Sequence, residues 1–193
     1  MAQTSRILAF SGSTRTDSYN KKLVKVAMRG AEAAGAQVTY VDLRELELPL
    51  YDGDLEQAQG LPAGARRFKD LLLANDGLLI SSPEYNSSIS AVLKNAIDWA
   101  SRPVPGEKPL QAFVGKVAGL MAASPSALGG LRGLVALRYI LGNIQVIVLP
   151  EQMVLGQSHS AFDENGDLKD EKQRAAAERI GRNVAEVSRK LTT

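Results

Sequence analysis

Arg6-Ile-Leu-Ala-Phe10-Ser-Gly-Ser-Thr-Arg15-Thr-Asp-Ser-Tyr-Asn20 is the stretch of sequence that decides the fold of this chain. Its apolar half, residues 6–10, is short and is closed by Ser-Gly-Ser, which is typical of a buried strand. Its polar half leads into residues 19–34, where apolar side chains recur at helical spacing and Gly35 is placed to end the helix. Strand, hydroxyl-rich turn and helix in this order predict the first β-α unit of a parallel sheet.

The alternation of strands and helices continues along the chain. We expect further strands at residues 37–43, 77–81, 116–123 and 144–149, the last one stopped by Pro150. We expect further helices at residues 63–74, 89–101, 131–141 and 168–191, with a turn at 163–166. Residues 44–60 and 102–115 contain proline and glycine and are predicted as long loops. The pattern predicts a single α/β domain with a parallel sheet and helices on both faces.

Composition excludes several classes of protein. The 193 residues carry 23 Lys+Arg against 21 Asp+Glu, a near-balance that does not suit a dedicated nucleic-acid binder. With 0 Cys there are no disulfides, thiolate zinc sites or cysteine nucleophiles, and the single histidine, His159, excludes a multi-histidine metal site. The longest apolar run, residues 117–123, is far short of the roughly 18 residues that span a bilayer. We expect a soluble cytoplasmic protein with no membrane or nucleic-acid partner.

In parallel sheets, ligands bind beyond the carboxyl ends of the strands, where the strand order reverses. The candidate loops are therefore residues 11–20, 83–88 and 124–130. The first loop offers the hydroxyls of Ser11, Ser13, Thr14, Thr16 and Ser18. Arg15 can hold a phosphate bidentately, and Gly12 allows close approach of the backbone. Lys21 and Lys22 oppose the helix dipole by a few tenths of a kcal/mol each, a sign that a bound dianion would reverse.

The first loop differs from the two familiar glycine-rich motifs. A dinucleotide fingerprint needs three spaced glycines, and only Gly12 is present, although Asp42 stands where a ribose-binding acid would be. A P-loop ending in Lys-Ser/Thr is also missing. The phosphate of a mononucleotide therefore fits better than a pyrophosphate. In the second loop, Pro83 fixes the direction of the chain, and Tyr85 and Asn86 offer a flat edge and amide donors to a planar ligand.

Two motifs together resemble a known family. The pattern Gly12-Ser13-x-Arg15-x-x-Ser18-x-Asn20, with Pro83-Glu84-Tyr85-Asn86, is similar to the NAD(P)H-dependent FMN reductases, in particular the bacterial quinone, azo and chromate reductases. Residues 49–52 and 93–99 also resemble that branch, and the likeness spans about residues 6–156. The resemblance implies a flavodoxin-like three-layer sandwich with strand order 2-1-3-4-5. It further implies bound FMN, NADPH or NADH as co-substrate, small-molecule acceptors, and a homodimer or homotetramer.

The resemblance also assigns residues to the cofactor. It places the phosphate of FMN at Ser13, Arg15, Ser18 and Asn20, and the isoalloxazine ring at Pro83, Glu84, Tyr85 and Asn86. The remaining expected contacts are Gly12, Tyr19, Ser124, Gly129 and Gly130. The implied reaction is ping-pong hydride transfer through flavin N5, which needs no catalytic side chain. Backbone N–H groups of residues 126–130 are expected to stabilise negative charge near flavin N1.

Four other functions remain open at this point. A flavodoxin-type electron carrier shares the fold and the FMN, but such carriers are typically acidic. A Rossmann-type dehydrogenase lacks its glycine fingerprint here. A serine hydrolase would need a Gly-x-Ser-x-Gly elbow, which is missing, and His159 lies in a Gly/Ser-rich segment typical of a solvated loop. A phosphate-binding module without a flavin is the fourth.

Overall fold

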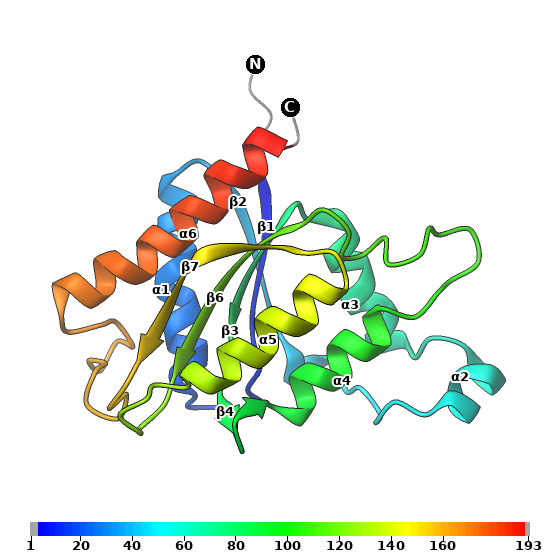
Figure 1. Ribbon diagram of the computed structural model, residues 1–193, viewed down its shortest axis with the longest axis horizontal. Coiled ribbons are helices and arrows are strands. Elements are labelled where there is room, and N and C mark those ends of the chain that lie inside the picture. The colour runs from blue at the N-terminus through cyan, green and yellow to red at the C-terminus, as the bar shows by residue number, and fades with distance from the viewer. Residues whose placement is uncertain (1–3, 192–193) are drawn as a thin grey trace.

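A parallel sheet forms the centre of the molecule in a computed structural model that describes residues 4–191 (Figure 1). The strands are β1 (Arg6–Ser11), β2 (Gln37–Asp42), β3 (Gly77–Ser81), β6 (Val117–Ala123) and β7 (Ile147–Leu155). Their order in the five-stranded sheet is β2-β1-β3-β6-β7, and every neighbouring pair is parallel. This order confirms the predicted flavodoxin-like topology, in which the order reverses between β1 and β3.

Helices cover both faces of the sheet (Figure 1). On one face lie α1 (Tyr19–Ala33) and α6 (Glu171–Leu191), and on the other lie α3 (Ala63–Ala74), α4 (Ala91–Ala100) and α5 (Leu131–Asn143). Each face therefore has its own apolar core. Helix α1 begins where the sequence predicts, because the hydroxyl of Ser18 accepts a hydrogen bond from the amide of Lys21 and so caps the helix.

Helices α1 and α6 approach each other more closely than ordinary side chains allow. A Cβ atom added at Gly30 of α1 would overlap the carbonyl oxygen of Glu178, and one added at Gly181 of α6 would overlap that of Ala27. The two backbones therefore touch at these glycines. This contact sets the distance between α1 and α6 within their layer.

The prediction that residues 44–60 form a loop is wrong in part. It contains the 3₁₀ helix η1 (Leu43–Leu46) and the short helix α2 (Gly53–Gln59). Asp42 caps η1 by accepting from the amide of Arg44, and Asp52 caps α2 by accepting from the amide of Asp54. Helix α2 has no buried residue, so it lacks the apolar periodicity by which sequence reasoning finds helices.

The prediction that Pro150 stops the last strand is also wrong, because β7 runs from Ile147 to Leu155 through it. The register between β6 and β7 shifts between Ala118 and Leu120, which places Pro150 in an irregularity of the ladder. Strand β7 lies at the edge of the sheet. A proline without an N–H is tolerated at such a bulge on an edge strand, since no ladder hydrogen bond is lost there.

Two helices begin later than predicted. Residues before α4 form a small hairpin of β4 (Glu84–Tyr85) and β5 (Ser88–Ile89), and α4 begins at Ala91, where the hydroxyl of Ser90 accepts from the amide of Leu93. Helix α6 begins at Glu171 rather than 168, because Phe162 and Leu168 pair across the turn at 163–166. That turn is confirmed by a hydrogen bond from the amide of Gly166 to the carbonyl of Asp163.

None of the helices in residues 4–191 is long and apolar enough to cross a bilayer.

We expect Gly181→Ala to lower the free energy of unfolding by about 2–3 kcal/mol, because the added methyl group forces the backbones of α1 and α6 apart. The matched control is Gly142→Ala in α5, where no heavy atom lies within 4 Å of the new Cβ. This control should be neutral or raise stability by about 0.5 kcal/mol. Urea unfolding followed by circular dichroism measures both, and equal effects would contradict the close contact.

Candidate functional site

The loops that follow β1, β3 and β6 meet at the carboxyl ends of these strands and enclose a cavity of about 140 Å³. The cavity brings together most of the residues singled out from the sequence. They are Ser13, Arg15, Ser18, Tyr19, Asn20, Pro83, Glu84, Tyr85 and Ser124, with Ala123 and Pro125. Gly12, Asn86, Gly129 and Gly130, which the sequence also indicated, do not line it.

The loop after β1 presents hydrogen-bond donors that have no partner within the described residues. The hydroxyl of Ser13 accepts from the amide of Arg15 at 3.4 Å and so folds the loop on itself. The guanidinium of Arg15 is exposed and makes no hydrogen bond or ion pair in residues 4–191. The amides of Thr14 and Asp17 are likewise unpaired in that range. Of these donors the guanidinium of Arg15 lines the cavity, and a free charged donor of this kind suits a phosphate.

Asn20 lines the cavity and joins three elements. Its Oδ1 accepts from the hydroxyl of Ser81 at 2.9 Å and from the amide of Ala123 at 2.9 Å, and its Nδ2 donates to the carbonyl of Ala123 at 2.9 Å. The side chain is buried and links the first turn of α1 to the ends of β3 and β6. Sequence reasoning missed this structural role, since it depends on a contact across 103 positions.

The loop after β3 is the β4–β5 hairpin, and it presents Tyr85 to solvent with 55% of the residue exposed. Asn86 (φ 51°) and Ser87 (φ 63°) form its two-residue turn, and positive φ at both positions is the geometry that fits a tight hairpin. Asn86 is suited to this conformation because its side chain tolerates the left-handed region. Its observed role is therefore that of a turn residue.

Glu84 anchors this hairpin to helix α5. Its carboxylate accepts from the amides of Arg132 at 3.0 Å and Gly133 at 3.2 Å and from Nε of Arg132 at 2.8 Å. A negative charge at the N-terminus of a helix is favourable, so Glu84 caps α5 from a distant loop. The amides of Arg132 and Gly133 are thus satisfied by the protein itself.

The glycines of the first and third loops are required by the backbone. Gly129 (φ 60°) and Gly130 (φ 93°) lie in the left-handed region, and a Cβ at Gly130 would approach Cβ of Ala122 to 2.8 Å. A Cβ at Gly12 would approach Cδ2 of Leu93 to 3.0 Å. Within the loop, the amide of Gly129 donates to the carbonyl of Ser126. These glycines let the loops pack closely around the cavity.

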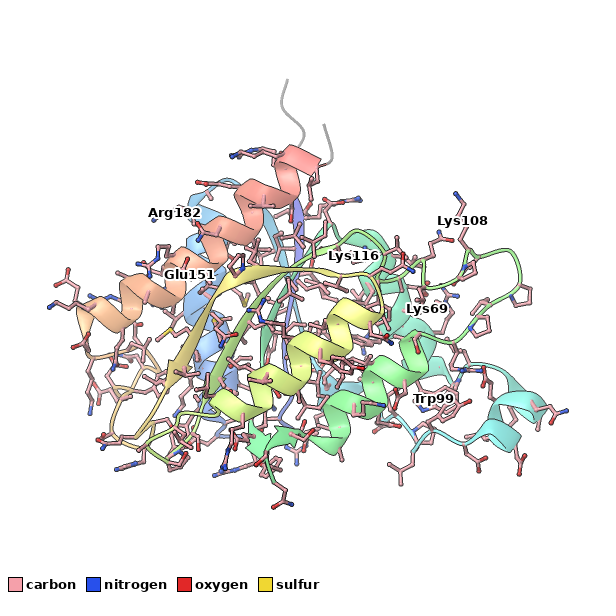
Figure 2. The ribbon with its side chains drawn as sticks, viewed as in Figure 1. Lys69, Trp99, Lys108, Lys116, Glu151 and Arg182 are labelled. Carbon is pink, nitrogen blue, oxygen red and sulfur yellow. The ribbon has the colours of Figure 1, made fainter. Side chains whose placement is uncertain are left out.

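The segments at residues 49–52 and 93–99 contact each other. Nε1 of Trp99 and Nδ2 of Asn95 both donate to the carbonyl of Pro49 at 2.8 Å, and Oδ1 of Asn95 accepts from the amide of Tyr51 at 2.8 Å. The rings of Tyr51 and Trp99 pack edge to face at 5.0 Å. Trp99 is fully buried beneath this segment and is a packing residue (Figure 2).

Two cations of the first helical turn lie outside this cavity. Lys21 and Lys22 line a second cavity on the other side of the loop, together with Asp42. The carboxylate of Asp42 is occupied by Nζ of Lys21 at 2.5 Å and by the amide of Arg44 at 3.0 Å. Asp42 is therefore engaged by the protein and does not stand free as a ribose-binding acid would.

The strand order, with a donor-rich loop at the point where it reverses, defines the class of the molecule as a flavodoxin-like α/β protein. Comparison with known proteins narrows this class. The model of the family described as NADPH-dependent FMN reductase matches residues 5–160. The chain belongs to this family.

Individual relatives agree with this assignment. An NAD(P)H-dependent FMN reductase of Pseudomonas aeruginosa is 39% identical over 176 residues, which are 90% of this chain and 90% of that protein. A quinone reductase of Pseudomonas putida is 34% identical over 172 residues, 88% of each chain. The structure of FerB, a flavoenzyme NAD(P)H:(acceptor) oxidoreductase from Paracoccus denitrificans, superposes with a TM-score of 0.80 at 30% identity, covering 97% of this chain and 98% of that one. The protein is an oxidoreductase that uses FMN and NAD(P)H.

The loop after β1 and the cavity that it lines form a cradle whose residues fit FMN. The phosphate of FMN is a dianion, and the loop supplies a guanidinium, hydroxyls and unpaired amides. The cavity of about 140 Å³ holds a phosphate and part of a chain, so a larger ligand would extend from it toward the hairpin. Relatives over most of the chain are FMN and quinone reductases, which favours a reductase over the electron carrier, the dehydrogenase, the hydrolase and the flavin-free module.

We expect Asn20→Ala to lower the free energy of unfolding by about 2–4 kcal/mol, because the hydroxyl of Ser81 and both backbone groups of Ala123 lose a buried partner. The comparison variant Ser81→Ala removes one of these bonds and should cost about 1 kcal/mol. Chemical denaturation measures the difference. Equal losses would show that Asn20 does not act as a shared link.

Proposed function

We propose that the loop at residues 12–20 binds the phosphate of FMN and that the chain transfers electrons from NAD(P)H to quinones and similar acceptors. The observation that carries the proposal is the set of unpaired donors in this loop, with Arg15 the one guanidinium that lines the described cavity. Arg15 contributes a charge-assisted hydrogen bond, and Ser13 and Ser18 contribute hydroxyls at the helix N-terminus. Asn20 supports the loop.

The hairpin is the proposed contact for the isoalloxazine ring. Tyr85 stands exposed beside the cavity, and Pro83 fixes the direction in which the chain leaves β3. Because Glu84 ties the hairpin to α5, Tyr85 is held in place before any ligand arrives. The third loop, with Ser124 and the amides of residues 127, 128 and 130, completes the proposed surface near the pyrimidine edge. The amides of Ser126 and Gly129, which the sequence analysis also expected there, already donate to Ser124 Oγ and to the carbonyl of Ser126.

FMN, when bound, would supply the redox chemistry, the transfer of two electrons from NAD(P)H to an acceptor, with the protons balanced by solvent. The residues of the chain bind and orient. Glu84 is the one carboxylate among the described residues that line the cavity, and its oxygens are held by Arg132 and the start of α5. The described part of the cavity therefore offers no free carboxylate as an acid or base.

Quinones are the acceptors that fit the relatives best, since several of these are quinone reductases. Azo compounds and chromate are further acceptors in the proposal, because an exposed reduced flavin reacts with small oxidants that reach it. We also propose a homodimer or homotetramer. The outer face of α5 carries a stripe of exposed apolar residues that association would cover, namely Leu131, Val135 and Tyr139. A cytoplasmic location and a single domain stay predictions.

We expect Arg15→Ala to weaken the binding of FMN about 10- to 150-fold, the loss of one charge-assisted contact of about 1.5–3 kcal/mol. Isothermal titration of the apoprotein with FMN measures the dissociation constant. Arg182→Ala, which removes the same charge from the exposed side of α6, is the matched control and should leave affinity unchanged (Figure 2). Unchanged affinity in Arg15→Ala would remove Arg15 from the phosphate site.

We expect initial rates measured with NADPH and 1,4-benzoquinone as the two varied substrates to give parallel lines in a double-reciprocal plot. The reason is that the nicotinamide must leave the flavin before the acceptor can occupy the same place. Converging lines would mean that both substrates are bound together. The FMN-loaded protein is used throughout, with the flavin content checked by absorbance, so that a result with NADH in place of NADPH is directly comparable.

A further inference from the structure

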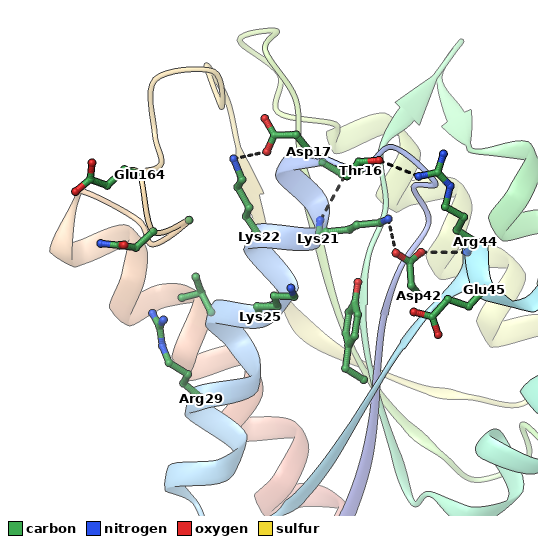
Figure 3. Close-up of a pocket in the computed structure, with 15 residues that line it drawn as sticks. Thr16, Asp17, Lys21, Lys22, Lys25, Arg29, Asp42, Arg44, Glu45 and Glu164 are labelled. Atoms are coloured by element: carbon green, nitrogen blue, oxygen red, sulfur yellow. Dashed lines mark hydrogen bonds and ion pairs between the residues drawn. The ribbon is translucent and has the colours of Figure 1, made fainter.

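A second and larger cavity lies behind the phosphate loop. It has a volume of about 700 Å³ and runs between α1 and β2, which is an edge strand of the sheet (Figure 3). The turn at residues 164–166 closes it on the side away from the sheet. This volume is in the range of small-molecule sites, whereas the cradle on the other side of the loop has about 140 Å³.

Cationic side chains from two elements reach into this groove. They are Lys21, Lys22, Lys25 and Arg29 of α1 and Arg44 of η1 (Figure 3). The sequence marked Lys21 and Lys22 as unfavourable at the start of a helix unless an anion is bound nearby. Both lysines face this groove rather than the FMN cradle, and their charges at the start of the helix are met by two carboxylates that line it, those of Asp42 and Asp17.

Three of these cations already have partners. Lys21 pairs with Asp42 at 2.5 Å, Lys22 pairs with Asp17 at 2.5 Å, and Arg29 pairs with Asp167 at 2.6 Å. The hydrogen bond from Lys22 keeps the pKa of the Asp17 carboxyl below its usual value, so this partner stays ionised at neutral pH.

Lys25 and Arg44 have no carboxylate partner among the described residues. Nζ of Lys25 lies 5.4 Å from the centre of the Tyr40 ring, and a guanidinium nitrogen of Arg44 donates to the hydroxyl of Thr16 at 2.8 Å. Of the acids that line the groove, Glu45 faces Arg67 outside it at 3.7 Å, and Glu164 points away from the lysines in Figure 3. Lys25 and Arg44 are therefore the two cations of the groove that no carboxylate pairs with, while the charge of Glu45 acts on the Tyr40 hydroxyl beside them.

Tyr40 adds an aromatic floor and a neutral donor. Burial, together with Asp42 and Glu45, raises the pKa of its hydroxyl to about 12, so the hydroxyl keeps its proton. It makes no hydrogen bond to any residue in 4–191. A flat ring beside two unpaired cations matches a ligand that has both a planar group and a phosphate.

We propose that this groove is a second phosphate-ester site, separate from the FMN cradle, in which Lys25 and Arg44 hold the phosphate and Tyr40 contacts the organic part. The site stands on its own residues and does not depend on the proposed role of Arg15. Two sources share this chemistry. One is the adenosine phosphate half of NADPH, and the other is a free nucleotide or sugar phosphate.

The groove adjoins the FMN cradle directly. Ser18 lines both cavities, and Thr16, whose hydroxyl accepts from Arg44, belongs to the same loop. A chain of contacts runs from Lys21 through Asp42 and the backbone of Arg44 to Thr16. A ligand that draws Arg44 toward its phosphate would therefore act on the loop that holds the FMN phosphate.

The test is calorimetric titration of the FMN-loaded protein with 2′,5′-ADP and, separately, with inorganic pyrophosphate. We expect saturable binding with one site per chain, weakened by added salt, and about tenfold weaker in Lys25→Gln. Lys94→Gln is the matched control, since it removes one exposed lysine from α4 on the opposite face of the sheet and should leave binding unchanged. FMN content, measured by absorbance, should be equal in all three proteins.

Kinetics then separate the two sources. A raised KM for NADPH in Lys25→Gln, with the KM for NADH unchanged, identifies the adenosine phosphate of the co-substrate as the occupant. Unchanged KM values together with weakened 2′,5′-ADP binding identify a separate phosphate ester. Failure of both probes to bind, or equal binding in Lys25→Gln and the parent protein, overturns the proposal. The binding and KM results for Lys25→Gln do not depend on whether Arg15→Ala loses affinity for FMN.

Discussion

The arrangement of the site depends above all on one buried amide. Asn20 holds the first turn of α1 against the ends of β3 and β6, with every bond at 2.9 Å. Without that link the ends of these strands would present unpaired polar groups in a buried place, which costs about 1–3 kcal/mol for each group. Because Asn20 directly follows the phosphate loop, the same bonds that satisfy the strand ends also fix the loop. The same hydrogen bonds therefore stabilise the fold and hold the loop in place.

A second constraint acts on the other side of the cavity. Glu84 uses its charge to cap α5, and in doing so it joins the hairpin to the helix. The resemblance to FMN reductases assigned Glu84 to the flavin, whereas its carboxylate is occupied by protein donors. Its contribution to a bound ring would come through the position of its neighbours Pro83 and Tyr85. The chain thus builds a rigid surface for a cofactor and leaves the chemistry to the flavin.

The sequence does not show in which direction the two lysines at the start of α1 point. Their charge near a helix N-terminus does indicate an anion, and sequence reasoning placed that anion in the nearest polar loop. A helix has several sides, and consecutive residues point about 100° apart. Only the position of β2 reveals that Lys21 faces Asp42, in a groove on the far side of the loop.

The sequence by itself determined the order of strands and helices, the three loops that meet at the site, and the family. Local patterns predict these features: apolar runs, helical periodicity, and the spacing of polar residues after β1 and β3. The tertiary structure alone decided that β7 passes through Pro150, that Asn86 and Ser87 form a hairpin turn, and that α2 forms without an apolar face. It also decided the partners of Asn20 and Glu84. The reason is physical: edge position, cross-strand pairing and distant capping depend on which segments become neighbours, and no local pattern carries that information.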